Sequence, residues 1–167
     1  MKNANYQRLL RGKGAHADPV ASLASVPFDV TGKTLEGYPH SIWQIVGHMN
    51  YWMEYELQRI GGKRPKYPEH AIEGFPSTLA PANEEEWAKA REGFTDRIRR
   101  LAELSEAGHE ILNAPVDVMD VSEESRSSSA EEVLWQIMVH NSYHVGQIAV
   151  LMRCFGLWPP PSGADTW

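Results

Sequence analysis

The stretch that decides the fold is residues 129–155, SAEEVLWQIMVHNSYHVGQIAVLMRCF, whose apolar residues recur at helical steps of three and four. Ser129 and Glu132 have the spacing of a capping box, which satisfies free backbone amides at the start of a helix. A glycine and a run of three prolines follow the stretch and predict its end. These signals predict one helix about 40 Å long. His140 and His144 lie in the middle of its apolar stripe.

Two further helices are predicted upstream of this one. Ser41 and Gln44 repeat the capping-box spacing, and the helix that they start ends at the glycines of 61–62. The other helix begins at Asn83, where three glutamates in the first turn interact favourably with the helix dipole. It ends at Gly108.

The N-terminal part of the chain predicts a helix in two pieces. A short helix over residues 6–10 stops at the Gly-Lys-Gly of 12–14. Asp18 then has the place of an N-cap, and Pro19 has the place of the first helical residue, where proline is favoured. The helical pattern continues from there to Val26.

Long loops separate the predicted helices. Residues 61–82 contain four prolines, and a connection of this length can cross a bundle from end to end. Residues 109–128 form a second polar loop. With the broken first segment counted as one helix, the sequence predicts an all-α fold, a four-helix bundle with a long connection between helices 2 and 3. We expect a single domain of this kind over residues 1–167.

Composition argues against several functional classes. The chain has 16 Lys and Arg against 22 Asp and Glu, which gives a net charge of −6. Contacts of basic residues with phosphates supply most of the affinity for nucleic acid, so an acidic chain is a poor nucleic-acid binder. No apolar run approaches the length of about 20 residues that a membrane span requires. The first residues lack the apolar core of a signal peptide, and a single cysteine, Cys154, excludes an intrachain disulfide. We therefore expect a cytoplasmic protein without a nucleic-acid or membrane partner, and a buried, unreactive Cys154.

Three histidines predict a metal site. His140 and His144 are four residues apart, so both rings project from one helix face and can reach the same ion. His48 lies in the equivalent middle of the apolar stripe that starts near Ser41. Three neutral imidazoles in one core need partners, and a divalent cation such as zinc, nickel, copper or iron satisfies all three together. Asn141 stands where the HExxH motif has its glutamate, so the usual base of a metalloprotease is missing.

Other interpretations of the histidines stay open at this point. Histidines four residues apart are common by chance, and a helical bundle with buried histidines and no metal is the simplest alternative. His16 lies in the glycine-rich break and is a candidate fourth ligand or substrate contact, although a loop cap is the more common role for such a residue. His40 precedes a helix start, and we expect it to face solvent.

The run HNSYHVGQI at residues 140–148, with His48 early in the second helix, resembles the DinB/YfiT-like superfamily. The resemblance implies a four-helix bundle with a long link between helices 2 and 3, and in many members a homodimer. It also implies a divalent metal, zinc or nickel in many members, held by His48, His140 and His144; iron is a third candidate. Within the C-terminal tail, Trp158–Trp167, and the residue before it, the segment Leu157–Gly163 has no counterpart in the general pattern.

The resemblance also suggests a function. Some members of the superfamily are thiol-dependent S-transferases or isomerases that use bacillithiol, mycothiol or glutathione. We therefore expect a metal-dependent transferase whose partners are a small-molecule substrate and a low-molecular-weight thiol. A metal-dependent hydrolase is one alternative, because a metal ion activates water as well as thiols. A non-catalytic bundle that binds a metal or a small molecule is the other.

Overall fold

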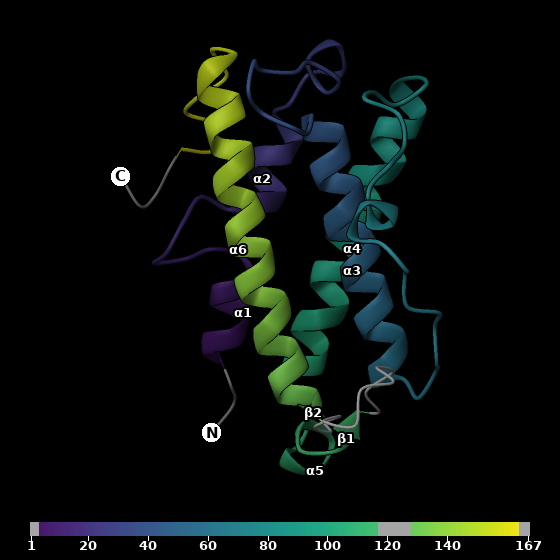
Figure 1. The fold of residues 1–167 in the computed structure, drawn as a ribbon. Helices are drawn as coiled ribbons and strands as arrows, with labels where there is room; N and C mark the ends of the chain where they lie inside the picture. Colours follow the sequence, from purple (N-terminus) through teal and green to yellow (C-terminus); the bar gives the residue numbers. More distant parts are fainter. Residues whose placement is uncertain (1–3, 117–127, 164–167) are drawn as a thin grey trace.

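Helices make up most of the computed structural model, which describes residues 4–116 and 128–163. Three long helices, α3 (Ile42–Ile60), α4 (Glu84–Ser105) and α6 (Ala130–Cys154), lie side by side (Figure 1). The shorter helices are α1 (Ala4–Leu10), α2 (Pro19–Ala24) and α5 (His109–Leu112), with 3-10 turns η1 (Phe28–Val30) and η2 (Ala71–Gly74) in the loops. Strands β1 (Pro115–Val116) and β2 (Ser128–Ser129) pair antiparallel, Pro115 with Ser129, at the start of α6.

Helix α3 is central to the arrangement because it packs against both α4 and α6. The short helices α1 and α2 pack against α4. The prediction of a helical fold is confirmed, but the described residues form six α-helices rather than four. The difference has two causes: the first segment is two separate helices, and the loop predicted over residues 109–128 contains α5, which is too short to show a period.

The predicted helix starts are confirmed by their hydrogen bonds. Ser41 and Ser129 each accept from the backbone amide three residues later, and the side chains of Gln44 and Glu132 bond back to the capping residues. The Asp18 side chain accepts from the first amides of α2, with proline at the first helical position. Each such cap is worth about 1 kcal/mol, so local sequence fixes where the long helices begin.

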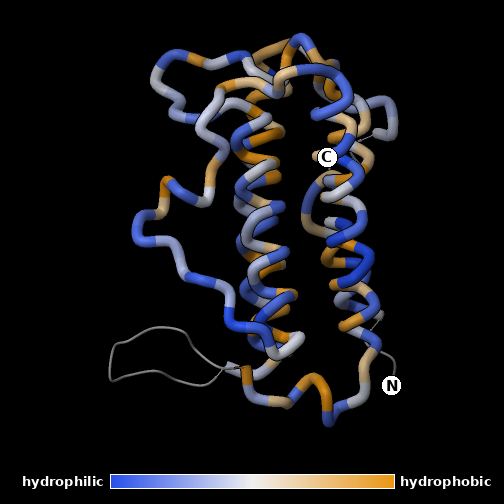
Figure 2. The backbone as a smooth tube through the Cα atoms, turned by 90° about the vertical axis from the view of Figure 1, so that its right-hand side faces the viewer, coloured by the Kyte–Doolittle hydropathy of each residue, from blue (hydrophilic) through white to orange (hydrophobic). Residues whose placement is uncertain are grey.

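The core lies between the long helices. Its fully buried side chains include Ile45, Met49 and Met53 of α3, Phe94 and Leu101 of α4, and Leu134 and Leu151 of α6. Leu10 of α1 and Leu23 of α2 belong to the same cluster. Figure 2 shows hydrophobic residues recurring between hydrophilic ones along the helices, as expected of helices with one buried face.

Part of the long link is bound along the first half of α3, and we call residues 74–79 the strap. Its hydrogen bonds with α3 and its N-cap are Ser41 Oγ to Leu79 O (2.5 Å), Trp43 Nε1 to Thr78 Oγ1 (3.2 Å) and Gln44 Nε2 to Pro76 O (3.2 Å). Gly47 allows the close approach, because a Cβ there would lie 2.2 Å from Pro76 Cγ. The strap therefore runs directly over the turn of α3 that carries His48.

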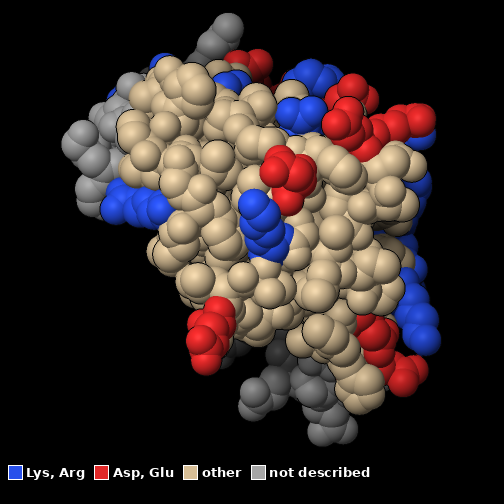
Figure 3. All heavy atoms as spheres, turned by 90° about the horizontal axis from the view of Figure 1, so that it is seen from above, with Lys and Arg blue, Asp and Glu red and all other residues tan. Residues whose placement is uncertain are grey.

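Charged side chains are sparse over the end of the molecule where α6 finishes and α3 begins. Figure 3 shows this end from above: uncharged residues form most of its centre, and most Lys, Arg, Asp and Glu lie towards the edge. Among the described helices, none is both long enough and apolar enough to cross a lipid bilayer.

Candidate metal centre

His48, His140 and His144 come together where α3 packs against α6. His48 lies in the first half of α3, and His140 and His144 are one turn apart on α6. One ligand nitrogen from each histidine lies within 4.8 Å of the other two. The two helical stripes thus bring the three predicted residues into one cluster, which can hold a divalent metal ion.

The spacing of the nitrogens suits such an ion. His48 Nε2 and His140 Nε2 are 3.2 Å apart. Two imidazole nitrogens on one tetrahedral zinc ion, each about 2.0–2.1 Å from it, are separated by about 3.3–3.4 Å. The His144 ring centre lies 4.8 Å from that of His48 and 4.5 Å from that of His140. The three residues therefore fit a three-histidine site without a change of fold.

Two protein oxygens orient two of the rings. His48 Nδ1 donates to the carbonyl oxygen of Gly74, 3.2 Å away in the strap. His144 Nδ1 donates to Gln147 Oε1, 2.6 Å away on the same helix. A histidine that donates from Nδ1 keeps its lone pair on Nε2, and His48 Nε2 is the nitrogen that faces His140. His140 Nδ1 is buried and has no hydrogen-bond partner among the described residues.

The sequence contained a signal for one of these orienting groups and none for the other. Gln147 follows His144 by three residues, so the helical period alone places the two side chains on one face. Gly74 lies 26 residues from His48, at the end of the 3-10 turn η2, and no helical period connects the two residues. The expectation stopped at the three histidines and missed both oxygens.

Burial keeps the three imidazoles neutral. It lowers the pKa of His48 from 6.5 to about 4, and the neighbouring His144 and His140 lower it further in the same direction. Burial, with a contribution from His144, lowers the pKa of His140 to about 4 as well. The pKa of His144 is also lowered, again mainly by burial. At neutral pH all three rings therefore carry the free lone pair that a metal ion requires.

An aromatic ring separates His48 from a fourth histidine. Phe75, in the strap, stacks on His48 with ring centres 3.8 Å apart and planes 14° apart. His40 stacks on Phe75, at 4.1 Å and 13°. The expectation that His40 faces solvent is therefore wrong: the ring is half-buried, because the strap brings Phe75 against it. Trp52 lies edge-on to His48, with ring centres 6.3 Å apart.

His16 is not part of the cluster. Its Nδ1 lies 2.9 Å from the carbonyl oxygen of Ala17, within the loop that follows α1. Gly12, at a φ of +74°, leaves room for this ring, since a Cβ there would lie 2.5 Å from His16 Nδ1. Of the roles open to His16, the loop cap is the one that this geometry matches.

Asn141 does not supply the base that the motif lacks. It is buried on α6, and its Nδ2 donates to Met53 Sδ, 3.3 Å away in α3. A side-chain amide does not take up or release a proton near neutral pH, so it cannot act as a general base, and this one points into the core. The cluster therefore offers metal ligands without an adjacent carboxylate in the part of the chain that the structure describes.

The end of α6 differs from the sequence prediction at Cys154, and the tail that follows it contacts the core. Cys154 is exposed, so the prediction of a buried thiol is wrong. The tail folds back beyond it: Trp158 packs against the main core, and the guanidinium of Arg153 lies 4.9 Å from the centre of its ring. Residues 164–167 of the Trp158–Trp167 tail lie outside the described residues.

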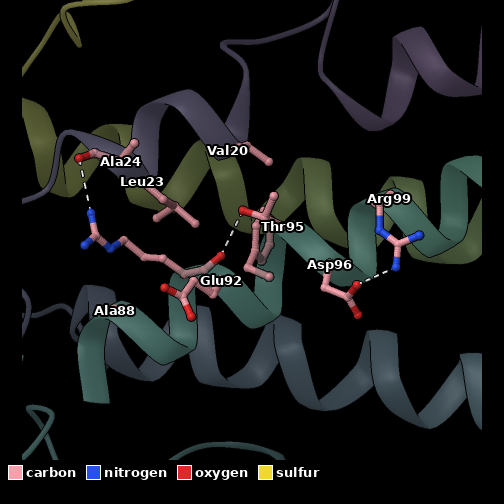
Figure 4. A pocket seen from close by; sticks show the side chains of 10 residues that line it. Val20, Leu23, Ala24, Ala88, Glu92, Thr95, Asp96 and Arg99 are labelled. Atoms are coloured by element: carbon pink, nitrogen blue, oxygen red, sulfur yellow. Dashed lines mark hydrogen bonds and ion pairs between the residues drawn. The ribbon is translucent and has the colours of Figure 1, made fainter. Parts of the chain in front are cut away.

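Two grooves lie elsewhere on the surface. One of about 430 Å³ runs between α2 and α4 (Figure 4), where Val20 and Leu23 approach α4 and Arg99 pairs with Asp96. Another, of about 420 Å³, lies beside α3 and is lined in part by Tyr51. None of the three histidines lines either groove. The three imidazoles that can bind a metal ion therefore lie in the histidine cluster and not in these grooves.

Comparison with known proteins gives one match. The model of the DinB family matches residues 6–165, which is almost the whole chain. The comparisons with curated proteins and with solved structures gave no match.

Proposed function

The chain belongs to the DinB family, and from this premise we propose that it binds one divalent metal ion through His48, His140 and His144. The observation that carries the proposal is the convergence of three neutral imidazoles on one point between α3 and α6. Two of them donate their Nδ1 proton to a protein oxygen, which leaves the Nε2 lone pair free. We favour zinc or nickel, with iron as a third candidate, because imidazole is a good ligand for all of them.

We further propose that the protein transfers a low-molecular-weight thiol to a small electrophilic substrate. A divalent ion held by three protein ligands supplies Lewis-acid chemistry, since it lowers the pKa of a thiol or a water molecule in its free position. A free thiol has a pKa of about 8.5, far below that of water, so a thiol needs far less activation. With Asn141 in place of a base, a thiol is the better-suited nucleophile, which favours a transferase over a hydrolase.

The protein's own residues bind and orient in this proposal. Gly74 and Gln147 hold the rings of His48 and His144 by their hydrogen bonds. Phe75 and Trp52 cover His48 with aromatic surface and exclude water from that side. The lack of a carboxylate in the described cluster favours a second candidate, a metal-binding protein without catalysis.

Elemental analysis of protein purified without a nickel column or a chelator tests the proposal. We expect about one divalent ion per chain, lost in His140→Ala and His144→Ala and retained in the control His16→Ala. The loaded protein is then mixed with a small thiol and an aryl halide. Consumption of the thiol that depends on the metal supports a transferase. Metal binding without consumption of the thiol supports the second candidate, a metal-binding protein without catalysis. A chain that takes up no zinc, nickel or iron refutes both.

We propose that the partner protein is a second copy of this chain, docked along α6. Trp135, Val139, Tyr143 and Val150 are exposed and follow one another at steps of four, four and seven, on one side of the helix. An exposed apolar stripe of this kind is typical of a protein interface. Light scattering should give a dimer for the native chain and a monomer for Val139→Glu, with Ile111→Glu, an exposed residue of α5, as the control.

Two further proposals concern the architecture of the bundle and the compartment of the protein. We infer that α1 and α2 together replace the first helix of a four-helix bundle, since both pack on α4 and contribute to the main core. The single cysteine, which rules out an intrachain disulfide, favours a reducing compartment such as the cytoplasm.

A further inference from the structure

Three aromatic rings form a continuous stack beside the candidate metal centre. Phe75 lies in the middle, 3.8 Å from the ring centre of His48 on one face and 4.1 Å from that of His40 on the other. The planes of neighbouring rings differ by only 14° and 13°. The phenyl ring thus occupies the space through which His40 would have to move to approach the cluster.

His40 is a fourth imidazole close to the ligands that does not belong to them. Its Nδ1 is buried and has no hydrogen-bond partner among the described residues. A positive charge on His40 lowers the pKa values of both His48 and His144, which places the ring within electrostatic reach of the centre. Stacking on Phe75, rather than a bond to Nδ1, holds this ring in its position.

The chain fixes the position of Phe75 from both sides. Its predecessor, Gly74, accepts the hydrogen bond from His48 Nδ1. Its successor, Pro76, accepts from Gln44 Nε2 and packs on Gly47 without room for a Cβ. With both neighbours anchored to α3, the phenyl ring cannot leave the stack without displacing the strap.

We propose that Phe75 is a spacer that keeps His40 out of the coordination sphere and so holds the site at three protein ligands. The inference rests on the proposed metal binding and deepens it. Four protein ligands close a zinc site and give it a structural role, whereas three leave one position for a small molecule. Phe75 therefore decides whether this centre can bind an exogenous ligand such as a thiol.

Cobalt(II) is a suitable probe because its visible spectrum reports ligand number and type. Full-length native protein is loaded with cobalt and titrated with 2-mercaptoethanol, and the thiolate-to-cobalt absorption gives the affinity. In Phe75→Ala, we expect His40 to coordinate: cobalt binds more tightly, and the affinity for the thiol falls by about tenfold or more. Phe75→Leu, which keeps most of the bulk, should behave as the native chain does.

A double variant identifies His40 as the group responsible. His40→Ala in the native background should leave cobalt binding unchanged, and His40→Ala combined with Phe75→Ala should restore the thiol affinity. If Phe75→Ala binds the thiol as well as the native chain, or if the double variant restores nothing, the spacer role is refuted. Should Phe75→Ala fail to fold, Phe75→Val removes the ring, leaves a side chain smaller than that of the Phe75→Leu control and opens part of the same space, and the same outcomes decide.

The two proposals fail in different ways. No cobalt uptake by the native protein would refute the metal site, and the spacer role with it. Cobalt uptake that His140→Ala abolishes, together with unchanged thiol binding in Phe75→Ala, would leave the metal site intact and refute the spacer alone.

Discussion

The carbonyl oxygen of Gly74 accepts a hydrogen bond from His48 Nδ1, 3.2 Å away, across 26 residues of sequence. This bond connects a candidate metal ligand on α3 to the strap, and it sets the tautomer that leaves Nε2 free. The geometry of the candidate centre therefore depends on a loop as well as on two helices.

Substitution of Gly74 tests that dependence. A Cβ at this position would lie 3.3 Å from His48 Nδ1 and 3.2 Å from Trp52 Nε1, which is closer than these rings tolerate without moving. We expect Gly74→Ala to lower zinc affinity by about tenfold, as is typical when an orienting group is disturbed. Isothermal titration with zinc measures the effect. Gly108→Ala, where a Cβ would meet nothing within 4 Å, is the control and should match the native chain.

Gln147 should have the same role for His144. We expect Gln147→Ala to weaken zinc binding by about 10- to 100-fold, because His144 loses the acceptor of its Nδ1 proton. Gln147→Glu retains an acceptor and should recover most of the affinity. Gln136→Ala changes an exposed glutamine of the same helix and should have no effect. Equal affinities for the Ala and Glu variants would argue against an orienting role.

Metal binding should stabilise the fold. At a free zinc concentration of about 100 times Kd, binding to the native state alone adds about 2.7 kcal/mol. For a chain of this length we expect a rise in Tm of about 5–10 °C, since each kcal/mol is worth about 2–4 °C. Calorimetry with zinc and then with EDTA measures the shift. His144→Ala should show no response, and a response equal to the native one would contradict the assigned ligands.

Acid should destabilise the metal-free protein through these histidines. Burial lowers the pKa of His48 to about 4 in the folded chain, while the unfolded chain keeps about 6.5. Above pH 6.5 both states are neutral and the group has no effect. Between pH 6.5 and about 4 only the unfolded state takes up the proton, so stability falls as pH falls, by about 3 kcal/mol for this residue. Urea unfolding of the native chain and of His48→Leu at pH 7.5 and 5 should give a smaller loss in the variant.

The close contact between Gly47 and Pro76 predicts a packing defect on substitution. A Cβ on residue 47 would lie 2.2 Å from Pro76 Cγ, so Gly47→Ala must displace the strap from α3. We expect a loss of about 1–3 kcal/mol of unfolding free energy, the usual cost of overpacking. Gly146→Ala, a helical glycine with open space around it, should instead stabilise slightly. Urea unfolding compares the two, and a stabilised Gly47→Ala would contradict the contact.

The parts of this molecule that follow local rules could be predicted from the sequence. The capping boxes at Ser41 and Ser129 are contained within four residues each, and both are confirmed. The cluster of His48, His140 and His144 follows from two helical stripes that must face the same core. The helical period predicts that these three histidines meet, because residues on the apolar stripe of a helix are the ones that face the core.

The contacts that the long link between α3 and α4 makes with the rest of the protein could not be predicted. The strap has no period, so nothing in the sequence connects Phe75 to His40 or Gly74 to His48; these pairs form only when the link lies on α3. The error over Cys154 has another origin. This residue lies four positions after Val150, on the same side of α6, and only the structure shows that this side is exposed.

The strap is attached to α3 by its own side-chain and main-chain bonds, and only Gly74 and Phe75 reach the candidate centre. The beginning of the link is therefore a suitable place to insert foreign sequence. Gly62 and Lys63 are exposed, and a doubling of loop length costs only about 0.6 kcal/mol in closure entropy. An affinity tag or a fluorescent reporter placed between these two residues would enter the chain upstream of the strap. Such an insertion would allow the protein to be captured or labelled while the contacts of the three histidines with the strap are retained.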